Sequence, residues 1–345
     1  MPARETGAAQ SPAAGEPDRA RAEAACLAEG LARRDRRAIA RAISQVEDET
    51  PIGRELLDLI FARAGSARRI GVTGPPGSGK STLVHALARQ LRQQGERVGV
   101  LAVDPTSPFT GGAILGDRVR MPTASEDEGF FVRSMASRGS LGGVASATYE
   151  ASEVLAAAGF DWILIETVGV GQSELEVVEL ADTVLLVLVP ESGDAVQTLK
   201  AGIMEIADVF VINKYDREGG DRLQRDIAVT LELTHWTRPG GWVPPICPAV
   251  ATAEEGIEEV MAEARAHLAW LDGDPARRER IRQEKAERRL RVLAERVLLR
   301  RLWDGAGLER RLAEALPRIA AREISPYRWL ASLPLDLAAA RGGRG

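Results

Sequence analysis

Residues 74–82 read GPPGSGKST and lie between the β-rich run RIGVTG (69–74) and the helical run TLVHALARQLRQQG (82–95). The nine letters match the pattern G-x-x-x-x-G-K-[ST] in the setting it requires, a strand before and a helix after. Glycines in such a loop let backbone N–H groups surround a phosphate at the positive end of the helix. The pattern therefore predicts a nucleotide-binding phosphate loop.

Two side chains of this loop have defined chemical tasks. Lys80 is expected to reach the β- and γ-phosphates, and Ser81 to supply a hydroxyl to Mg²⁺. The residues expected to contact the bound nucleotide are Gly74, Pro75, Pro76, Gly77, Ser78, Gly79, Lys80, Ser81 and Thr82.

Around the loop, short β-rich runs alternate with segments of helix length. Strands separated by helices indicate βαβ units, and nearly continuous apolar runs are typical of strands buried on both faces. The sequence thus predicts an α/β fold of the P-loop NTPase class with a mostly parallel central sheet. The expected strands are 69–74, 97–104, 130–134, 162–167, 183–189, 209–213 and 242–247.

Composition divides the chain into four parts. Residues 1–17 are predicted to be a disordered tail, and residues 18–66 a helical segment broken at Thr50-Pro51. Residues 67–273 form the predicted P-loop domain, which ends at the turn residues LDGDP. Residues 274–345 begin with an Arg-rich helix whose narrow apolar stripe suits either packing on its own domain or a dimer arm.

Charge and cysteine content limit the other possibilities. The net charge of −5 gives no general reason to expect nucleic acid, and Cys26 and Cys247 are too few for a disulfide framework. The longest apolar stretch, 183–190, is far shorter than the ~20 residues that a membrane helix needs. Residues 1–20 have neither an apolar signal core nor the acid-poor character of a transit peptide. These features favour a cytoplasmic protein without a membrane or nucleic-acid partner.

The run VFVIN leads into NKYD (213–216), an N-K-x-D pattern at a predicted strand end, where open α/β sheets bind ligands. The carboxylate of Asp216 can accept hydrogen bonds from N1–H and N2–H₂ of guanine, whereas adenine offers no such pair. Asn213 would hold the loop and Lys214 would cover the base. Downstream of a phosphate loop, this pattern favours GTP and GDP over adenine nucleotides.

Two acidic residues, Asp104 and Glu166, stand at the ends of predicted strands, where this mechanistic class holds Mg²⁺ or its waters. Gly169 could sense the γ-phosphate through its N–H group, as the glycine of the D-x-x-G motif does in other GTPases. Glu166 replaces the aspartate of that motif.

Longer motifs carry a resemblance to a known family. The sequence resembles the MeaB/ArgK family of P-loop GTPases, which includes the methylmalonyl-CoA mutase-associated GTPases. The residues that carry the resemblance are GPPGSGKST (74–82), VDPTSPFTGGAILGDRVRM (103–121), ETVGVGQSE (166–174), GDAVQTLKAGIMEIAD (193–208) and NKYD (213–216).

The resemblance implies a GTPase that acts as a chaperone for an adenosylcobalamin-dependent acyl-CoA mutase, gating cofactor delivery and protecting the mutase from inactivation. It also implies a homodimer formed through the C-terminal arm. Asp104 and Asp117 match the switch I region that lines the Mg²⁺ site, and Arg120 a phosphate-region arginine. Asp194 and Lys200 match switch III, where Lys200 is expected to supply partner-stimulated positive charge.

The sequence departs from the family pattern in places. The base-capping loop corresponds only loosely to residues 247–256, which gives Val250 and Ala251 as expected base contacts. No glutamine follows Gly169 directly, so slow hydrolysis that a partner accelerates is predicted.

Two alternatives stay open: a nickel-insertion metallochaperone GTPase, and an ATP-dependent kinase or transport ATPase. The first needs clustered ligands, whereas His85, His235 and His267 are scattered in sequence.

Overall fold

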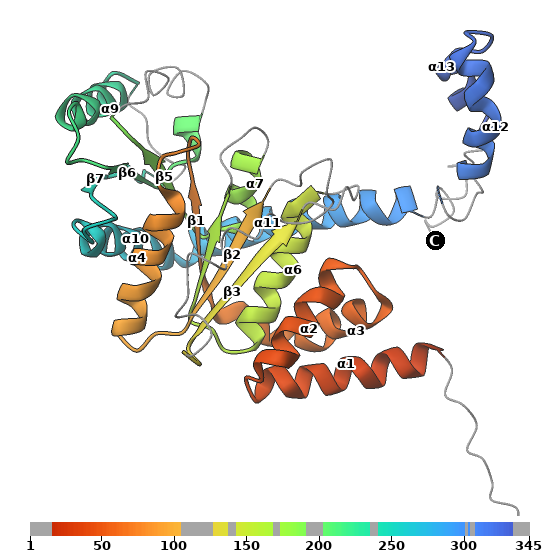
Figure 1. Cartoon of the computed structure of the whole chain (residues 1–345), viewed down its shortest axis with the longest axis horizontal. Helices are drawn as coiled ribbons and strands as arrows, with labels where there is room; N and C mark the ends of the chain where they lie inside the picture. The colour runs from red at the N-terminus through yellow and green to blue at the C-terminus, as the bar shows by residue number, and fades with distance from the viewer. Residues whose placement is uncertain are drawn as a thin grey trace, which may run out of the picture. The chain divides into compact units, whose positions relative to one another are not determined.

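A parallel sheet of seven strands forms the centre of the fold (Figure 1). The computed structural model describes residues 16–104, 127–136, 143–167, 173–190, 203–234, 241–300, 303 and 308–333. The strand order is β3-β2-β4-β1-β5-β6-β7, and every pair is parallel. The predicted α/β architecture is confirmed. The strands are β1 (Arg68–Thr73), β2 (Val98–Asp104), β3 (Phe130–Ala136), β4 (Trp162–Glu166), β5 (Thr183–Leu188), β6 (Val209–Asn213) and β7 (Ile246–Ala249).

The last strand starts later than the sequence predicts. The run 242–247 was expected to be a strand, but β7 begins only at Ile246. Pro244 and Pro245 precede it, and a proline has no N–H group to donate to a sheet ladder. Pairing with β6 therefore begins only after these two consecutive prolines, at Ile246.

Helices cover both faces of the sheet, as Figure 1 shows. Helices α4 (Lys80–Gln93) and α10 (Ile257–Asp272) pack on the face that contains Val72, Leu164 and Val187. The opposite face carries α6 (Gly143–Ala157), α7 (Ser173–Leu180) and α9 (Gly220–Thr234), together with the short 3₁₀ helix η3 (Ile203–Ile206). Strands β4, β5 and β6 are buried throughout, as their apolar runs predict.

The N-terminal segment is helical, as predicted, and packs against α6. Its helices are α1 (Glu16–Ala32), α2 (Arg36–Glu47) and α3 (Pro51–Ile60), followed by the 3₁₀ helix η1 (Phe61–Ser66). The expected break precedes Pro51, where the Oγ1 of Thr50 accepts a hydrogen bond from the N–H of Gly53 at 3.0 Å. A buried ion pair of 2.7 Å joins Arg69 to Glu153, and Arg69 also donates to the carbonyl of Ala64. These contacts connect the helical segment to the sheet.

Three aspartates fix the N-terminal edge of the sheet. Each aspartate directly precedes a strand. Its carboxylate accepts a hydrogen bond from a backbone N–H group that lies in a neighbouring strand or in the residue directly before that strand. The pairs are Asp161 with Arg97 N at 2.8 Å, Asp182 with Arg69 N at 2.9 Å and Asp208 with Val184 N at 2.9 Å. Because a hydrogen bond to a charged acceptor contributes about 1.5–3 kcal/mol, these contacts help to set the strand register.

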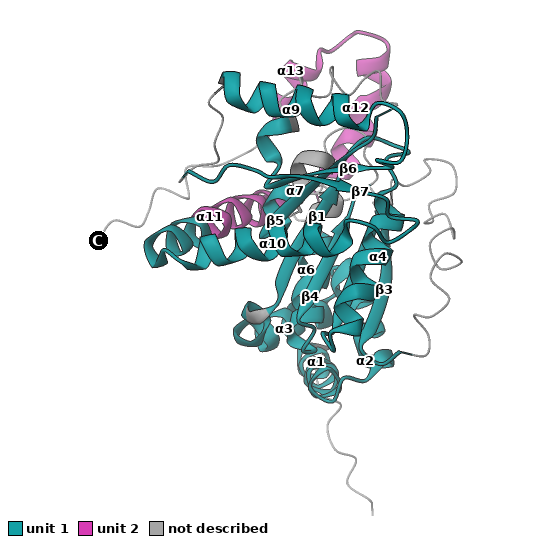
Figure 2. Cartoon of the chain, turned by 90° about the vertical axis from the view of Figure 1, so that its left-hand side faces the viewer, with its two compact units in different colours: residues 1–283 teal, residues 284–345 magenta. Residues whose placement is uncertain are grey.

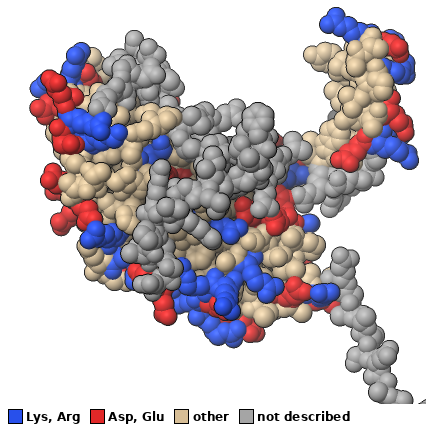
Figure 3. Space-filling model, in the orientation of Figure 1, with Lys and Arg blue, Asp and Glu red and all other residues tan. Residues whose placement is uncertain are grey.

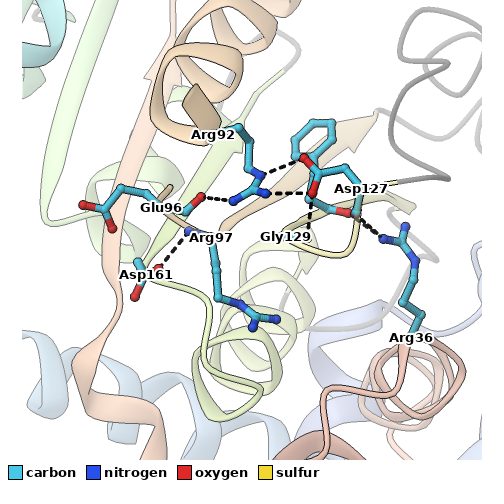
Figure 4. A network of polar contacts seen from close by, with 8 residues as sticks. Arg36, Arg92, Glu96, Arg97, Asp127, Gly129 and Asp161 are labelled. Carbon is cyan, nitrogen blue, oxygen red and sulfur yellow. Dashed lines mark hydrogen bonds and ion pairs between the residues drawn. The ribbon is translucent and has the colours of Figure 1, made fainter. Parts of the chain in front are cut away.

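A network of arginines and carboxylates connects α2, α4 and the start of β3 (Figure 4). Arg92 donates two hydrogen bonds to Asp127, at 2.8 and 2.7 Å, and Arg36 donates to the Asp127 carbonyl at 2.9 Å. The hydrogen bond from Arg92 lowers the pKa of Asp127 and raises that of Arg92. On the face drawn in Figure 3, basic and acidic side chains likewise lie among one another.

The chain divides into two compact units, residues 1–283 and residues 284–345, which Figure 2 colours separately. The boundary lies within helix α11 (Pro275–Arg300), and the second unit also contains α12 (Leu308–Ala320) and α13 (Pro326–Ala331). The domain limits expected from composition stay predictions. None of the helices in the described ranges has the length and apolar character needed to cross a membrane.

Candidate nucleotide-binding site

The phosphate loop leaves β1 through a glycine that no other residue could replace without strain. Gly74 has φ +142°, and a Cβ atom there would lie 2.1 Å from the carbonyl oxygen of Val187 in β5. At the other end, Gly79 has φ +86° and directly precedes α4. A Cβ atom on Gly79 would lie 2.4 Å from the Nδ2 of Asn213. Both glycines thus permit close approach of the loop to neighbouring strands.

Lys80, the first residue of α4, is buried, and its Nζ donates hydrogen bonds to the carbonyls of Gly74 and Pro75 at 2.9 and 3.0 Å. The ammonium group therefore lies inside the curve of the loop. Among the described residues, no side chain caps the N-terminus of α4, and the positive end of the helix dipole faces the loop. This arrangement suits a bound phosphate group.

Glu166 ends β4, and its Oε1 accepts a hydrogen bond of 2.5 Å from the Oγ of Ser81. Its side chain is 9% exposed. The structure thus brings together Ser81 and Glu166, which are 85 residues apart in the sequence. The sequence predicts both as Mg²⁺ ligands. A hydroxyl and a carboxylate are hard oxygen donors of the kind Mg²⁺ prefers, so these residues fit that ion.

Asn213 connects the phosphate loop to the loop after β7. Its Nδ2 donates to the carbonyl of Ser78 at 2.8 Å, and its Oδ1 accepts from the N–H of Ala251 at 3.1 Å. The side chain is 2% exposed. The sequence expectation that Asn213 holds the loop agrees with these contacts. The N–H of Val250 donates to Glu255 at 3.0 Å, which shapes the loop where Val250 and Ala251 lie.

The other residues of NKYD surround the loop from the same side. Lys214 has φ +57° and donates from Nζ to the carbonyl of Gly77 at 2.9 Å. Tyr215 contacts Asp221 of α9 through its hydroxyl at 2.6 Å, and this hydrogen bond raises the pKa of Tyr215. Asp216 is exposed, and no described residue donates a hydrogen bond to its carboxylate.

A pair of buried threonines lies beside these residues and was not singled out from the sequence. The Oγ1 of Thr167 donates to the Oγ1 of Thr73 at 2.9 Å. Thr73 immediately precedes the phosphate loop and Thr167 immediately follows Glu166. The sequence signal was the presence of a threonine at the end of each of two apolar runs.

Several proposed site residues lie wholly or partly outside the described part of the chain. The backbone of Asp104 ends β2, but its side chain is outside the described part of the chain. The remaining site residues that lie outside the described ranges are Asp117, Arg120, Gly169, Asp194 and Lys200.

The chain is similar to a known family and to several known proteins. Residues 39–306 match the family described as "Methylmalonyl Co-A mutase-associated GTPase MeaB". A putative GTPase of Pyrococcus abyssi is 46% identical over 304 residues, which is 87% of this chain and 93% of that protein. The GTPase ArgK of Escherichia coli is 34% identical and covers 90% of this chain and 96% of its own length.

Two further relatives extend the comparison. The mitochondrial "Methylmalonic aciduria type A homolog" of Mus musculus is 38% identical over 248 residues, 67% of this chain and 60% of that protein. A crystal structure of an LAO/AO transport system kinase aligns with a TM-score of 0.65 at 28% identity and covers 90% of this chain and 96% of its own. The family match covers the phosphate loop, Glu166 and NKYD together, so the chain belongs to the MeaB family and is a P-loop GTPase.

Proposed function

We propose that this GTPase is a chaperone of an adenosylcobalamin-dependent acyl-CoA mutase, methylmalonyl-CoA mutase or a close relative, which gates cofactor loading and protects the mutase from inactivation. One observation carries the proposal: the match over residues 39–306 to a family described as mutase-associated. The name of the mouse relative, which refers to methylmalonic aciduria, points in the same direction.

The site supports GTP binding in a defined orientation. Backbone N–H groups of the non-proline loop residues, such as Gly77 and Gly79, and the N-terminus of α4 would hold the β-phosphate. Lys80 would exchange its contacts with the loop carbonyls for phosphate oxygens, because an ammonium group binds an anion more strongly than a neutral carbonyl. The exposed carboxylate of Asp216 would accept the two guanine donors, and Lys214 would cover the base.

Ser81 and Glu166 would hold Mg²⁺, with Asp104 and Asp117 as further proposed ligands. The ion would supply positive charge that neutralises the phosphate oxygens. Placement of positive charge is the main contribution of the protein to phosphoryl transfer. Arg120 and Lys200 are proposed to complete this charge when the mutase binds, and Asp194 lies near Lys200 in the sequence segment that matches switch III.

The C-terminal arm, residues 274–345, is proposed to form a homodimer. Its described helices carry exposed apolar side chains: Leu290 is 67% exposed and Leu298 63% on α11, and Leu316 is 52% exposed on α12. Leu290 and Leu298 lie about two turns apart on α11, and exposed apolar side chains that share a helix surface are typical of surfaces that pack against another chain. The oligomeric state in solution, with the arm intact and with Leu290 and Leu298 changed to Gln, tests this part.

The central experiment measures GTP and ATP hydrolysis by the purified protein, alone and with each candidate adenosylcobalamin-dependent acyl-CoA mutase. Slow GTP hydrolysis that one mutase accelerates is the expected result. Asp216→Ala is expected to remove the preference for GTP over ATP, while Asp221→Ala, at an exposed position on α9, keeps it. A protein whose GTP hydrolysis responds to none of the mutases would refute the chaperone proposal.

A further inference from the structure

Thr73 and Thr167 lie at corresponding positions of two paired strands. In the parallel pair of β1 and β4, Val72 lies opposite Glu166. The N–H of Thr167 donates to the carbonyl of Val72 at 3.1 Å, which continues the ladder by one residue. Thr73 and Thr167 follow, and their hydroxyls are 2.9 Å apart. The hydroxyl pair therefore lies directly beyond the last hydrogen bond of the ladder, where both strands lead into the loops of the site.

Glu166 and Thr167 point to opposite faces of the sheet, because side chains alternate along a strand. Glu166 points to the face covered by α4, where its carboxylate meets Ser81. Thr167 points to the other face, with Ile163 and Ile165. Glu166 is thus held by the strand ladder before it and by the hydroxyl pair directly after it.

The two hydroxyls are enclosed. Thr73 is fully buried and Thr167 is 2% exposed. Within the described residues, each hydroxyl has only the other as its hydrogen-bond partner. One hydroxyl proton of the pair therefore has no described acceptor. Two valines of the same shape would avoid this cost, since replacing both partners of a buried hydrogen bond by apolar groups is often neutral or stabilising.

We propose that Thr73 and Thr167 are positioning residues that hold the backbone after Glu166 so that its carboxylate meets the Ser81 hydroxyl in the geometry Mg²⁺ requires. The proposal rests on the Mg²⁺ role proposed above for Ser81 and Glu166. Mg²⁺ demands nearly ideal octahedral geometry, so a ligand that is free to shift binds it less well. Groups that orient a metal ligand affect affinity even though they never touch the metal.

The test measures Mg²⁺ affinity without relying on hydrolysis. Protein loaded with fluorescently labelled GDP is titrated with Mg²⁺, and the concentration that half-maximally slows GDP release is recorded. Thr73→Val/Thr167→Val is expected to need about tenfold more Mg²⁺, the lower end of the usual effect of losing an orienting group. Thr73→Ser/Thr167→Ser retains the hydroxyls and is expected to stay within about twofold of wild type.

Two controls separate positioning from stability. Thr148→Val changes another buried threonine, on α6, whose hydroxyl has no partner within the described residues, and is expected to leave Mg²⁺ affinity unchanged. Urea unfolding of the nucleotide-free proteins should give the double valine variant a midpoint at or above that of wild type. If that variant does not fold, Thr73→Ala/Thr167→Ala takes its place in the titration.

The outcomes distinguish the two proposals. Glu166→Gln tests the metal role directly, and an unchanged Mg²⁺ requirement in that variant overturns the role of Glu166 and the positioning role with it. A large effect of Glu166→Gln together with a wild-type Mg²⁺ requirement in the hydroxyl-free variants overturns only the positioning role. Weaker Mg²⁺ binding in the valine variant, restored by serine, supports it.

Discussion

Asn213 offers the sharpest test of how the site is held together. Its side-chain amide bridges two loops by donating to the Ser78 carbonyl and accepting from the Ala251 N–H, at 2.8 and 3.1 Å. The side chain is 2% exposed, so water has little access to the groups it contacts. Asn213→Ala removes both hydrogen bonds at once and leaves two buried backbone groups without partners.

The expected cost follows from those two groups. A buried polar group that loses its partner costs about 1–3 kcal/mol, so the variant should lose about 2–6 kcal/mol of unfolding free energy. Most folded domains have only about 5–15 kcal/mol in total. The phosphate loop also loses its link to the loop that contains Ala251. If ordering the phosphate loop on binding then costs about 1.4 kcal/mol of binding free energy, GDP binds about tenfold more weakly.

The assay combines urea unfolding of the nucleotide-free protein, followed by tryptophan fluorescence, with GDP binding by titration calorimetry. We expect Asn213→Ala to lower the urea midpoint and to weaken GDP binding at least about tenfold. Tyr215→Phe, two positions further along the chain, removes only the hydroxyl that contacts α9 and serves as the matched control. A wild-type midpoint and wild-type GDP affinity in Asn213→Ala would refute the bridging role.

Asn213→Asp tests the same two contacts through the dependence of the free energy of unfolding on pH. The introduced carboxylate can still accept from the Ala251 N–H, but it places an oxygen against the Ser78 carbonyl, which disfavours the charged form. Its pKa in the folded state should therefore lie above its unfolded value. Protonation restores a donor toward Ser78, so the variant should gain stability relative to wild type as the pH falls through that raised pKa. A relative stability that does not rise on acidification would contradict the geometry.

Three further predictions concern other parts of the fold. Gly79→Ala places a Cβ atom 2.4 Å from the Asn213 Nδ2 at φ +86°, and calorimetry should find GDP binding weakened at least about tenfold. The hydrogen bond from Arg92 lowers the pKa of Asp127 below its usual value, so the ionised form stabilises the fold above that usual value. The benefit is lost as the pH falls through the lowered pKa. The difference in urea midpoint between wild type and Asp127→Asn should accordingly shrink on acidification, and a constant difference would argue against the ion pair. Asp182→Ala should cost about 1.5–3 kcal/mol in urea unfolding with GDP affinity unchanged, and a parallel loss of GDP binding would show that the two edges of the sheet are coupled.

The parts of the site that the sequence predicted are those whose chemistry is local. The phosphate loop places Gly74, Lys80 and Ser81 within eight residues, and their backbone demands are visible as glycines at fixed offsets. NKYD is local in the same way, and the contact of Asn213 with Ser78 agrees with its expected role. The late start of β7 has a local cause too, because Pro244 and Pro245 interrupt the apolar run 242–247 that predicts the strand.

The contacts that sequence reasoning missed depend on strand order. Thr73 and Thr167 are 94 residues apart, and they meet only because β1 lies beside β4. Asp182 and Arg69 meet because β1 also lies beside β5. A single sequence gives the strands but not their neighbours, so a threonine or aspartate at a strand end has no visible partner. These residues therefore resemble ordinary turn residues until the sheet is known.

Polar side chains have different roles at the amino and carboxyl edges of the sheet. All strands run in one direction, so every loop that carries chemistry leaves the carboxyl edge, and every strand begins at the other. The first N–H groups of buried strands need acceptors, and Asp161, Asp182 and Asp208 supply them. At the carboxyl edge the polar side chains join loops to one another, through Asn213 with Ser78 and Glu166 with Ser81. Because the carboxyl-edge loops do not have to secure the strand register, they can place polar groups for a nucleotide. Substitutions at either edge can therefore lower the urea midpoint, but only those at the carboxyl edge, such as Asn213→Ala, should also weaken GDP binding.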